Sequence, residues 1–199
     1  MTTSKPYHHG DLRRQLIAVG EEVLTERGIA ALSLREVARR LGVSHNAPFK
    51  HFASREALLA AIAEEGFGDL TARLATAMAG DPQEAMTARA LAYVTFALER
   101  PAVFRLMFGG QVDAAQHPSL AERAETSLRG ITRHIAGAYG EEALDEATLS
   151  AWAFVHGLAN LLLDGQIPPG LRKGRSDEDL AKAVVAAMAH GLGYPAGAA

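Results

Sequence analysis

Residues 33–59 read SLREVARRLGVSHNAPFKHFASREALL, and they carry the clearest structural pattern in the chain. Ser33 followed three positions later by Glu36 is a capping box, which predicts the start of a short helix. Gly42 is placed to end that helix, because glycine tolerates the left-handed backbone of a tight turn. Ser44 and Ser54 are favourable N-cap residues and predict two further helix starts. The stretch therefore predicts two short helices joined by a tight turn, and then the start of a longer helix.

A helix pair this short cannot bury a hydrophobic core by itself. Such pairs serve to place one small polar helix in the DNA major groove. On the helix that begins at Ser44, we expect Ala47 and Phe52 to face inward. Four polar side chains are then left facing outward: His45, Asn46, Lys50 and His51.

The composition favours a helical protein. The 199 residues are 48% hydrophobic and rich in alanine, which suits a buried core built from helices. The chain has no cysteine, so it has no disulfides or thiolate metal sites, and this fits a reducing cytosol. It shows no apolar signal segment and no apolar run of about 18 residues that could span a membrane. We therefore predict a cytoplasmic, nucleoid-associated protein without membrane contact.

Charge is unevenly distributed along the chain. Residues 1–60 contain nine Lys/Arg and six Asp/Glu, a balance of +3, whereas residues 61–199 contain eleven and seventeen, a balance of -6. A basic end on an acidic body suits a protein that presents one end to phosphate groups. Ordinary solvated surface charge is the alternative explanation.

Hydrophobic periodicity predicts an all-α fold of about nine helices. The expected helices span 11–27, 33–41, 44–51, 54–79, 82–100, 101–108, 118–139, 142–165 and 176–192. Residues 1–10 are expected to form a flexible arm, 166–175 a mobile basic loop and 193–199 a disordered tail. We expect a DNA-binding domain at residues 1–60 and a second helical domain at 61–199, with the boundary inside the fourth helix.

Two motifs resemble a known family. TetR-family bacterial transcriptional regulators typically read V-S-x-x-x-x-Y-x-H-F-x-S-K-x-x-L, and this chain matches with Val43-Ser44, His51-Phe52, Ser54 and Leu58. The segments Tyr7-His-His-Gly-Asp-Leu-Arg13 and Trp152-Ala-Phe-Val-His-Gly157 resemble the subgroup named for its Trp-His-Gly (WHG) C-terminal domain. The resemblance implies an N-terminal three-helix helix-turn-helix domain fused to a helical ligand-binding and dimerisation domain.

The resemblance and the residue chemistry together predict the DNA contacts. Asn46 and His45 are assigned to base edges, and Lys50 and His51 to phosphates or nearby bases. Helix starts collect phosphate oxygens, so the remaining contacts are expected there. The complete predicted set is Ser33, Arg35, Ser44, His45, Asn46, Phe49, Lys50, His51 and Arg55. The alternative is that the serines serve only as caps and that Phe49 belongs to the core with Phe52.

Three positions depart from the family pattern or from regular helix chemistry. Phe49 stands where the family usually has Tyr, so a hydroxyl that often bonds a phosphate is missing. Arg55 replaces the usual Lys, which keeps the charge but changes the geometry. Pro48 forfeits one early backbone hydrogen bond.

The second domain offers material for a ligand pocket. In the family this region binds a small molecule, and a pocket needs mostly apolar walls with a few polar groups. The predicted lining consists of Tyr93, Phe96, Phe104, Met107, Phe108, Trp152 and His156. These side chains could instead be packed core, because aromatic residues at helical spacing usually are.

The last two helices combine small and large apolar residues, a pattern that suits an isologous four-helix interface between two copies of the chain. The predicted interface consists of Gly157, Leu158, Leu161, Leu162, Val184, Val185 and Met188. Packing within one subunit is the alternative.

These observations predict a ligand-responsive transcriptional regulator without a cofactor or metal. We expect a repressor that binds a palindromic operator as a homodimer and is released by a small molecule. A helical-bundle enzyme would need Glu-x-x-His ligands or a nucleophile with its base, and the sequence has no such pattern. A helical interaction module without DNA affinity is the other alternative.

Overall fold

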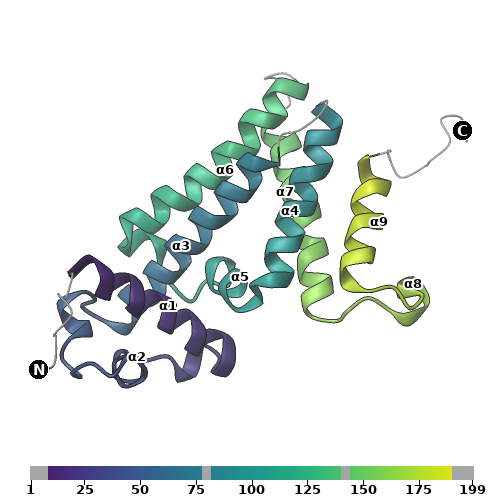
Figure 1. Cartoon of the computed structure of the whole chain (residues 1–199). Helices are drawn as coiled ribbons and strands as arrows, with labels where there is room; N and C mark the ends of the chain where they lie inside the picture. The colour runs from purple at the N-terminus through teal and green to yellow at the C-terminus, as the bar shows by residue number, and fades with distance from the viewer. Residues whose placement is uncertain (1–8, 78–81, 140–143, 190–199) are drawn as a thin grey trace, which may run out of the picture. The chain divides into compact units, whose positions relative to one another are not determined.

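The computed structural model describes residues 9–77, 82–139 and 144–189. These residues form α-helices and short 3₁₀ turns, with no strand among them (Figure 1). The α-helices are α1 (His9–Arg27), α2 (Leu34–Leu41), α3 (Arg55–Thr76), α4 (Pro82–Glu99), α5 (Pro101–Phe108), α6 (Pro118–Tyr139), α7 (Leu144–Leu163), α8 (Pro169–Arg172) and α9 (Asp177–Ala189). The 3₁₀ turns are η1 (Ile29–Ala31), η2 (Pro48–Lys50) and η3 (Ala114–Gln116). The all-α prediction is confirmed.

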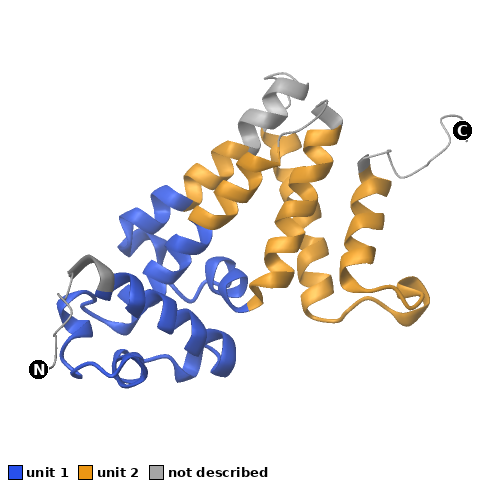
Figure 2. Ribbon diagram, in the orientation of Figure 1, with its two compact units in different colours: residues 1–67, 102–123 blue, residues 68–101, 124–199 orange. Residues whose placement is uncertain are grey.

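The chain divides into two compact units (Figure 2). Unit 1 comprises residues 1–67 and 102–123, and unit 2 comprises residues 68–101 and 124–199. The division therefore falls inside α3, the predicted fourth helix, but it also assigns α5 and the start of α6 to the first unit. The compact units do not test which residues bind DNA, so the predicted boundary between the DNA-binding domain and the second domain at residue 60 stays a prediction.

The core of unit 1 is built from α1, α2, α3 and α5. Its fully buried side chains include Leu16, Ile17, Val23, Val37, Leu58, Ile62 and Phe104. Gly66 allows α5 to approach α3 closely, because a Cβ there would lie 2.7 Å from both Val103 and the sulfur of Met107. Phe108 fills the neighbouring space, with its ring centroid 5.4 Å from that of Phe67.

In unit 2, α4 packs against both α7 and α9. Phe96 of α4 is completely buried. Two guanidinium groups cover its ring, that of Arg73 at 5.4 Å and that of Arg100 at 5.7 Å from the ring centroid. Asp69 accepts hydrogen bonds from both arginines, so these cations are held in place by a carboxylate. The result is a tight junction between the end of α3 and the end of α4.

The structure differs from the sequence prediction in two segments. The predicted helix at 44–51 is a series of turns followed by η2, because Pro48 has no N–H and its ring obstructs the carbonyl of the residue four positions earlier. The predicted loop at 166–175 contains the single helical turn α8. Arg172 fastens that turn through a 2.6 Å ion pair with Asp177.

Some expectations lie outside the described residues. They are the Tyr7 part of the WHG-type pattern, nearly all of the predicted arm, the break at 80–81 and the predicted tail.

Candidate nucleic-acid interface and effector pocket

The helix α2 is fixed at both ends. Ser33 Oγ accepts a hydrogen bond from the backbone N–H of Glu36 at 3.1 Å, which caps the first turn. Gly42 adopts the left-handed conformation (φ 68°, ψ 25°) and its N–H bonds back to carbonyls of the last turn. This is the capped short helix that the sequence predicts, with its sharp stop.

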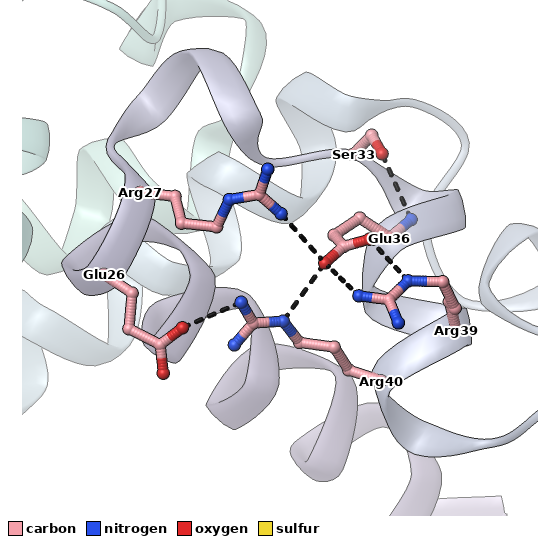
Figure 3. Close-up of polar contacts among 6 residues, drawn as sticks. All are labelled: Glu26, Arg27, Ser33, Glu36, Arg39 and Arg40. Atoms are coloured by element: carbon pink, nitrogen blue, oxygen red, sulfur yellow. Dashed lines mark hydrogen bonds and ion pairs between the residues drawn. The ribbon is translucent and has the colours of Figure 1, made fainter.

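Glu36 also gathers three arginines around its carboxylate (Figure 3). Arg27 of α1 reaches it at 3.3 Å, and Arg39 and Arg40 of α2 reach it at 2.7 and 3.2 Å. Arg40 pairs in addition with Glu26 of α1 at 2.8 Å. The hydrogen bonds that Arg39 and Arg40 donate to Glu36 lower the pKa of Glu36 to about 2, so this carboxylate stays charged at physiological pH. The network ties α2 to the end of α1.

Residues 44–51 form an outward-facing segment that we call the reading segment. Its polar members Ser44, His45, Asn46 and Lys50 are exposed, and His51 is half-buried. Pro48 and Phe52 are buried and anchor the segment to unit 1, while Ala47 is only half-buried. The inward side is therefore Pro48 and Phe52 rather than Ala47 and Phe52. Pro48 is a rigid apolar ring, so the residue that disrupts the helix also anchors the segment.

Phe49 is 51% exposed, so the alternative that it belongs to the core is wrong. Like its neighbour Lys50, it is exposed on the reading segment. Ser44 bonds the N–H of Asn46 through its Oγ at 3.3 Å, which is a local turn contact rather than a regular helix cap.

Arg35 and Arg55 occupy helix starts as the sequence predicts, but they differ in what they touch. Arg35 is exposed on the first turn of α2. Arg55 donates from Nε to the carbonyl of Leu32 at 2.8 Å and from Nη2 to the carbonyl of Ile29. The structure thus gives Arg55 a bracing role within unit 1, and its assignment to a phosphate stays a prediction.

Unit 2 contains a pocket between four helices. Its wall consists of Leu74 from α3, Met86, Arg89, Ala90 and Tyr93 from α4, Ala151, Trp152, Phe154 and Val155 from α7, and Met188 from α9. The cavity measures about 60 Å³. Nearly all of the wall is carbon. Among the wall residues that the structure describes, the polar side-chain atoms belong to Arg89, Tyr93 and Trp152.

A chain of hydrogen bonds runs along the edge of this pocket. Trp152 Nε1–H donates to the hydroxyl oxygen of Tyr93 at 3.3 Å, and that hydroxyl lies 3.0 Å from Nδ1 of His156. Burial raises the pKa of Tyr93 and lowers the pKa of His156, so the phenol and the imidazole are both neutral at pH 7. The hydroxyl donates to Nδ1 in the tautomer that carries the imidazole proton on Nε2, and it accepts from Nδ1 in the other tautomer.

The predicted ligand residues separate into three groups. Tyr93 and Trp152 line the pocket, and His156 bonds Tyr93 beside it. Phe96 is completely buried beneath the two arginines. Phe104, Met107 and Phe108 belong to unit 1, where they pack against one another or against Phe67 and Gly66.

The sequence analysis missed most of the pocket wall. Met86, Arg89, Ala90 and Tyr93 recur at helical spacing on α4, as do Ala151, Trp152 and Val155 on α7. That spacing was visible in the sequence, but small and aliphatic residues on one helix face usually indicate core. Met188, predicted for the dimer interface, also lines the pocket.

The predicted interface residues divide between the surface and the interior of unit 2. Gly157 and Leu161 are exposed, Leu161 at 43%, and Met188 is 38% exposed. Val184 is half-buried. Leu158, Leu162 and Val185 are buried within the subunit.

Among the described residues, no helix is long and apolar enough to cross a membrane. In the same part of the chain, no group of three or more His, Asp or Glu side chains could hold a metal ion.

The chain matches two family models. Residues 16–62 match the model described as bacterial regulatory proteins, tetR family, and residues 86–188 match the model described as tetracyclin repressor-like, C-terminal domain. Among curated proteins, the HTH-type transcriptional regulator Rv1816 of Mycobacterium tuberculosis is 26% identical over 132 residues, which cover 64% of this chain and 54% of the relative. The chain thus spans about half the length of the curated relatives it matches.

Solved structures share the fold over nearly the whole chain. A protein of unknown function from Rhodococcus sp. RHA1 is 36% identical with a TM-score of 0.79, covering 94% of this chain and 98% of the other. A transcriptional regulator of the TetR/AcrR family from Thermobifida fusca YX-ER1 is 22% identical with a TM-score of 0.68, covering 91% and 98%. At that identity the second likeness concerns the fold alone.

Proposed function

Because the chain belongs to the tetR family of bacterial regulatory proteins, we propose that it represses transcription as a homodimer that leaves its operator when a small effector binds. Family membership makes it a DNA-binding transcriptional regulator rather than an enzyme. The repressor role, the palindromic operator, the dimer and the effector are the proposal, as is its place of action in the cytoplasm on the nucleoid. The WHG subgroup stays a prediction.

The observation that carries the proposal is the exposed reading segment. Asn46 and His45 stand at its start, where the polar side chains are free to meet base edges. Lys50 and His51 supply positive charge or donors for phosphates, and Phe49 adds an apolar contact where the family usually places a hydroxyl. Four further residues are proposed to contact phosphates of the DNA backbone, because they lie at the starts of helices or turns. They are Ser33, Arg35, Ser44 and Arg55.

An exposed apolar stripe on α7 supports a dimer. Leu149, Ala153, Gly157 and Leu161 follow one another at intervals of four residues, and all four are exposed. Leu149 is 61% exposed and nothing lies within 4 Å of a Cβ built on Gly157, so a second helix could approach closely. A stripe of this kind on a monomer would leave large apolar side chains in water. Two-fold symmetry would then give a palindromic operator with half-sites one or more helical turns apart.

The proposed control is a two-state hinge. The first part of α3 belongs to unit 1 and its last part to unit 2, where Leu74 lines the pocket. A ligand that favours one position of Leu74 therefore biases the helix that also carries part of the DNA-binding unit. If the ligand weakens DNA binding by some factor, DNA weakens ligand binding by the same factor.

Site selection from a random duplex library tests the DNA half of the proposal. Wild-type protein should enrich a palindromic motif, and Asn46→Ala should enrich a motif that is degenerate at one or two positions, because a bidentate contact is worth about 1–3 kcal/mol of discrimination. An unchanged motif from the variant would remove Asn46 from base reading. Failure of the wild type to retain any duplex at low salt would refute the proposal.

Light scattering tests the dimer half. Leu161→Glu places a charge in the α7 stripe and should yield monomers. Leu171→Glu is the matched control, because Leu171 is 66% exposed on α8, outside the stripe. If both variants remain dimeric, the stripe is not the interface.

A further inference from the structure

We infer that the pocket in unit 2 binds an uncharged, predominantly apolar molecule, and that neither an anion nor a cation is its ligand. This inference rests on the proposed role of the pocket as an effector site and adds the chemical class of the effector. It follows from the wall of the pocket, from what its polar atoms already bond, and from its size.

The wall offers a ligand carbon and aromatic faces. Leu74, Met86, Val155 and Met188 supply aliphatic or thioether surface, and Trp152 and Phe154 supply aromatic rings. A charged group brought against such a wall loses its water and gains no equivalent partner, which costs several kcal/mol. An apolar ligand loses nothing comparable and gains by leaving water, at about 25 cal/mol per Å² buried.

Tyr93 and Trp152 have their polar atoms engaged with each other and with His156. The Tyr93 hydroxyl accepts from Trp152 and shares a hydrogen bond with Nδ1 of His156, so it already has two partners within the protein. A ligand that bonded this hydroxyl would have to compete with these partners. The net gain from that exchange is small, so the chain of bonds does not select for a polar ligand.

Among the wall residues that the structure describes, Arg89 is the one cation, and it braces the main chain. Its Nη1 donates to the carbonyl of Leu74 at 2.9 Å and its Nη2 to the carbonyl of Gly130 at 3.1 Å. These two bonds join the end of α3 to α6 and fix the plane of the guanidinium. These bonds occupy two of the five guanidinium N–H donors and orient the group toward the main chain, and almost none of the wall surface that faces the cavity is polar. Arg89 therefore presents mainly its apolar stem to the cavity.

The size of the cavity sets a further limit. About 60 Å³ holds only a few water molecules, less than the engineered cavity of about 150 Å³ that admits benzene in another protein. A ligand of one aromatic ring therefore needs part of the wall to move. Met86 and Met188 are suited to this, because methionine is unbranched and adapts its shape readily. Met188 is 38% exposed, so we expect a ligand to enter the pocket beside this side chain.

The position of Trp152 makes a direct test possible, because it is the single tryptophan of the chain and lies in the wall. Its fluorescence, excited where the probes do not absorb, can be followed during titration with toluene, benzoate and benzylamine. These probes share one ring and differ in charge. Toluene should alter the emission and raise the melting temperature of the full chain, at concentrations at least about tenfold below those needed for either charged probe.

Two pocket-filling variants supply the control. Ala151→Leu, or Ala90→Leu if the first does not fold, should abolish the toluene response. Ala72→Leu on the exposed face of α3 should keep it. Tighter binding of benzoate or benzylamine than of toluene would overturn the apolar class and leave the effector role standing. If no probe binds and Ala151→Leu leaves the response of DNA binding to cell extract unchanged, the effector role of the pocket fails as well.

Discussion

The reading segment and the pocket treat their polar groups in opposite ways. In the reading segment, His45, Asn46 and Lys50 point to solvent, while two apolar residues beneath them, Pro48 and Phe52, hold the backbone in place. In the pocket, the polar atoms of Tyr93, Trp152 and Arg89 bond partners within the protein, and mostly carbon faces the cavity.

The difference follows from what each surface meets. A DNA groove presents donors, acceptors and phosphates, so the protein must keep its own polar atoms available for them. An apolar molecule offers no hydrogen bonds, so any polar atom in its pocket has to be satisfied elsewhere. The direction in which donors point thus indicates the chemistry of the partner before the partner is known.

The largest expected effect comes from the anchors of the reading segment. Phe52→Ala removes a side chain that is 3% exposed and should lower the free energy of unfolding by about 3–5 kcal/mol. Phe49→Ala removes the same ring from a position that is 51% exposed and should change it by less than about 0.5 kcal/mol. Chemical denaturation of both variants measures the contrast. Equal losses of unfolding free energy in the two variants would show that Phe52 does not anchor the segment more than Phe49 does.

The second effect concerns the satisfied polar atoms of the pocket. Tyr93→Phe removes a hydroxyl and leaves Trp152 Nε1–H and His156 Nδ1 without it, which should cost about 1–3 kcal/mol of stability. Asn46→Ala in the reading segment should cost almost nothing, because its amide is exposed to water. Urea titration compares the two variants, and a larger loss for Asn46→Ala would reverse the distinction between the sites.

Local signals in the sequence predicted much of this arrangement. The Ser33–Glu36 box, Gly42 and Ser54 each act within four residues, so their caps and stops appear where the pattern places them. The prediction for the reading segment was weaker, since it noted the lost bond at Pro48 but not that the helix would give way to turns and η2. Proline is an early-turn residue in many helices, and only the structure shows that here it is buried.

The pocket was harder to predict because it depends on tertiary contacts. Leu74, Arg89 and Gly130 meet only after α3, α4 and α6 have packed, and no local pattern relates them. The aromatic residues that drew attention, Phe96 and Phe104, are fully buried core. The sequence therefore indicated that aromatic side chains line the pocket, but it did not show which aromatic residues do so.

A third prediction concerns the phosphate role of Lys50. Lys50→Ala should weaken binding to every duplex and reduce the slope of log affinity against log salt by about 1, since one counterion fewer is released. The selected motif should stay the same, because a phosphate contact carries no base information. A slope that does not change would mean that Lys50 touches no phosphate.

A fourth prediction concerns a buried hydroxyl that, unlike the polar atoms of the pocket, has no hydrogen-bond partner among the described residues. Thr148 on α7 is 7% exposed, and its Oγ1 has no hydrogen-bond partner among the described residues. Thr148→Val removes the unsatisfied oxygen and keeps the branched shape, so it should raise the free energy of unfolding by about 1 kcal/mol. Thermal denaturation measures the gain, and a loss of stability would show that the hydroxyl is bonded in solution.

The smallest expected effect is a pH dependence that comes from His156 beside the pocket. Burial lowers the pKa of His156 in the folded chain, so below about pH 6.5, the ordinary value for histidine, the unfolded chain binds a proton that the folded chain does not. Stability contributed by the neutral imidazole is then present above that pH and is lost as the pH falls through it. His156→Gln should flatten this part of the curve of melting temperature against pH. A curve that His156→Gln leaves unchanged would show that burial of the imidazole beside Tyr93 does not affect stability in this pH range.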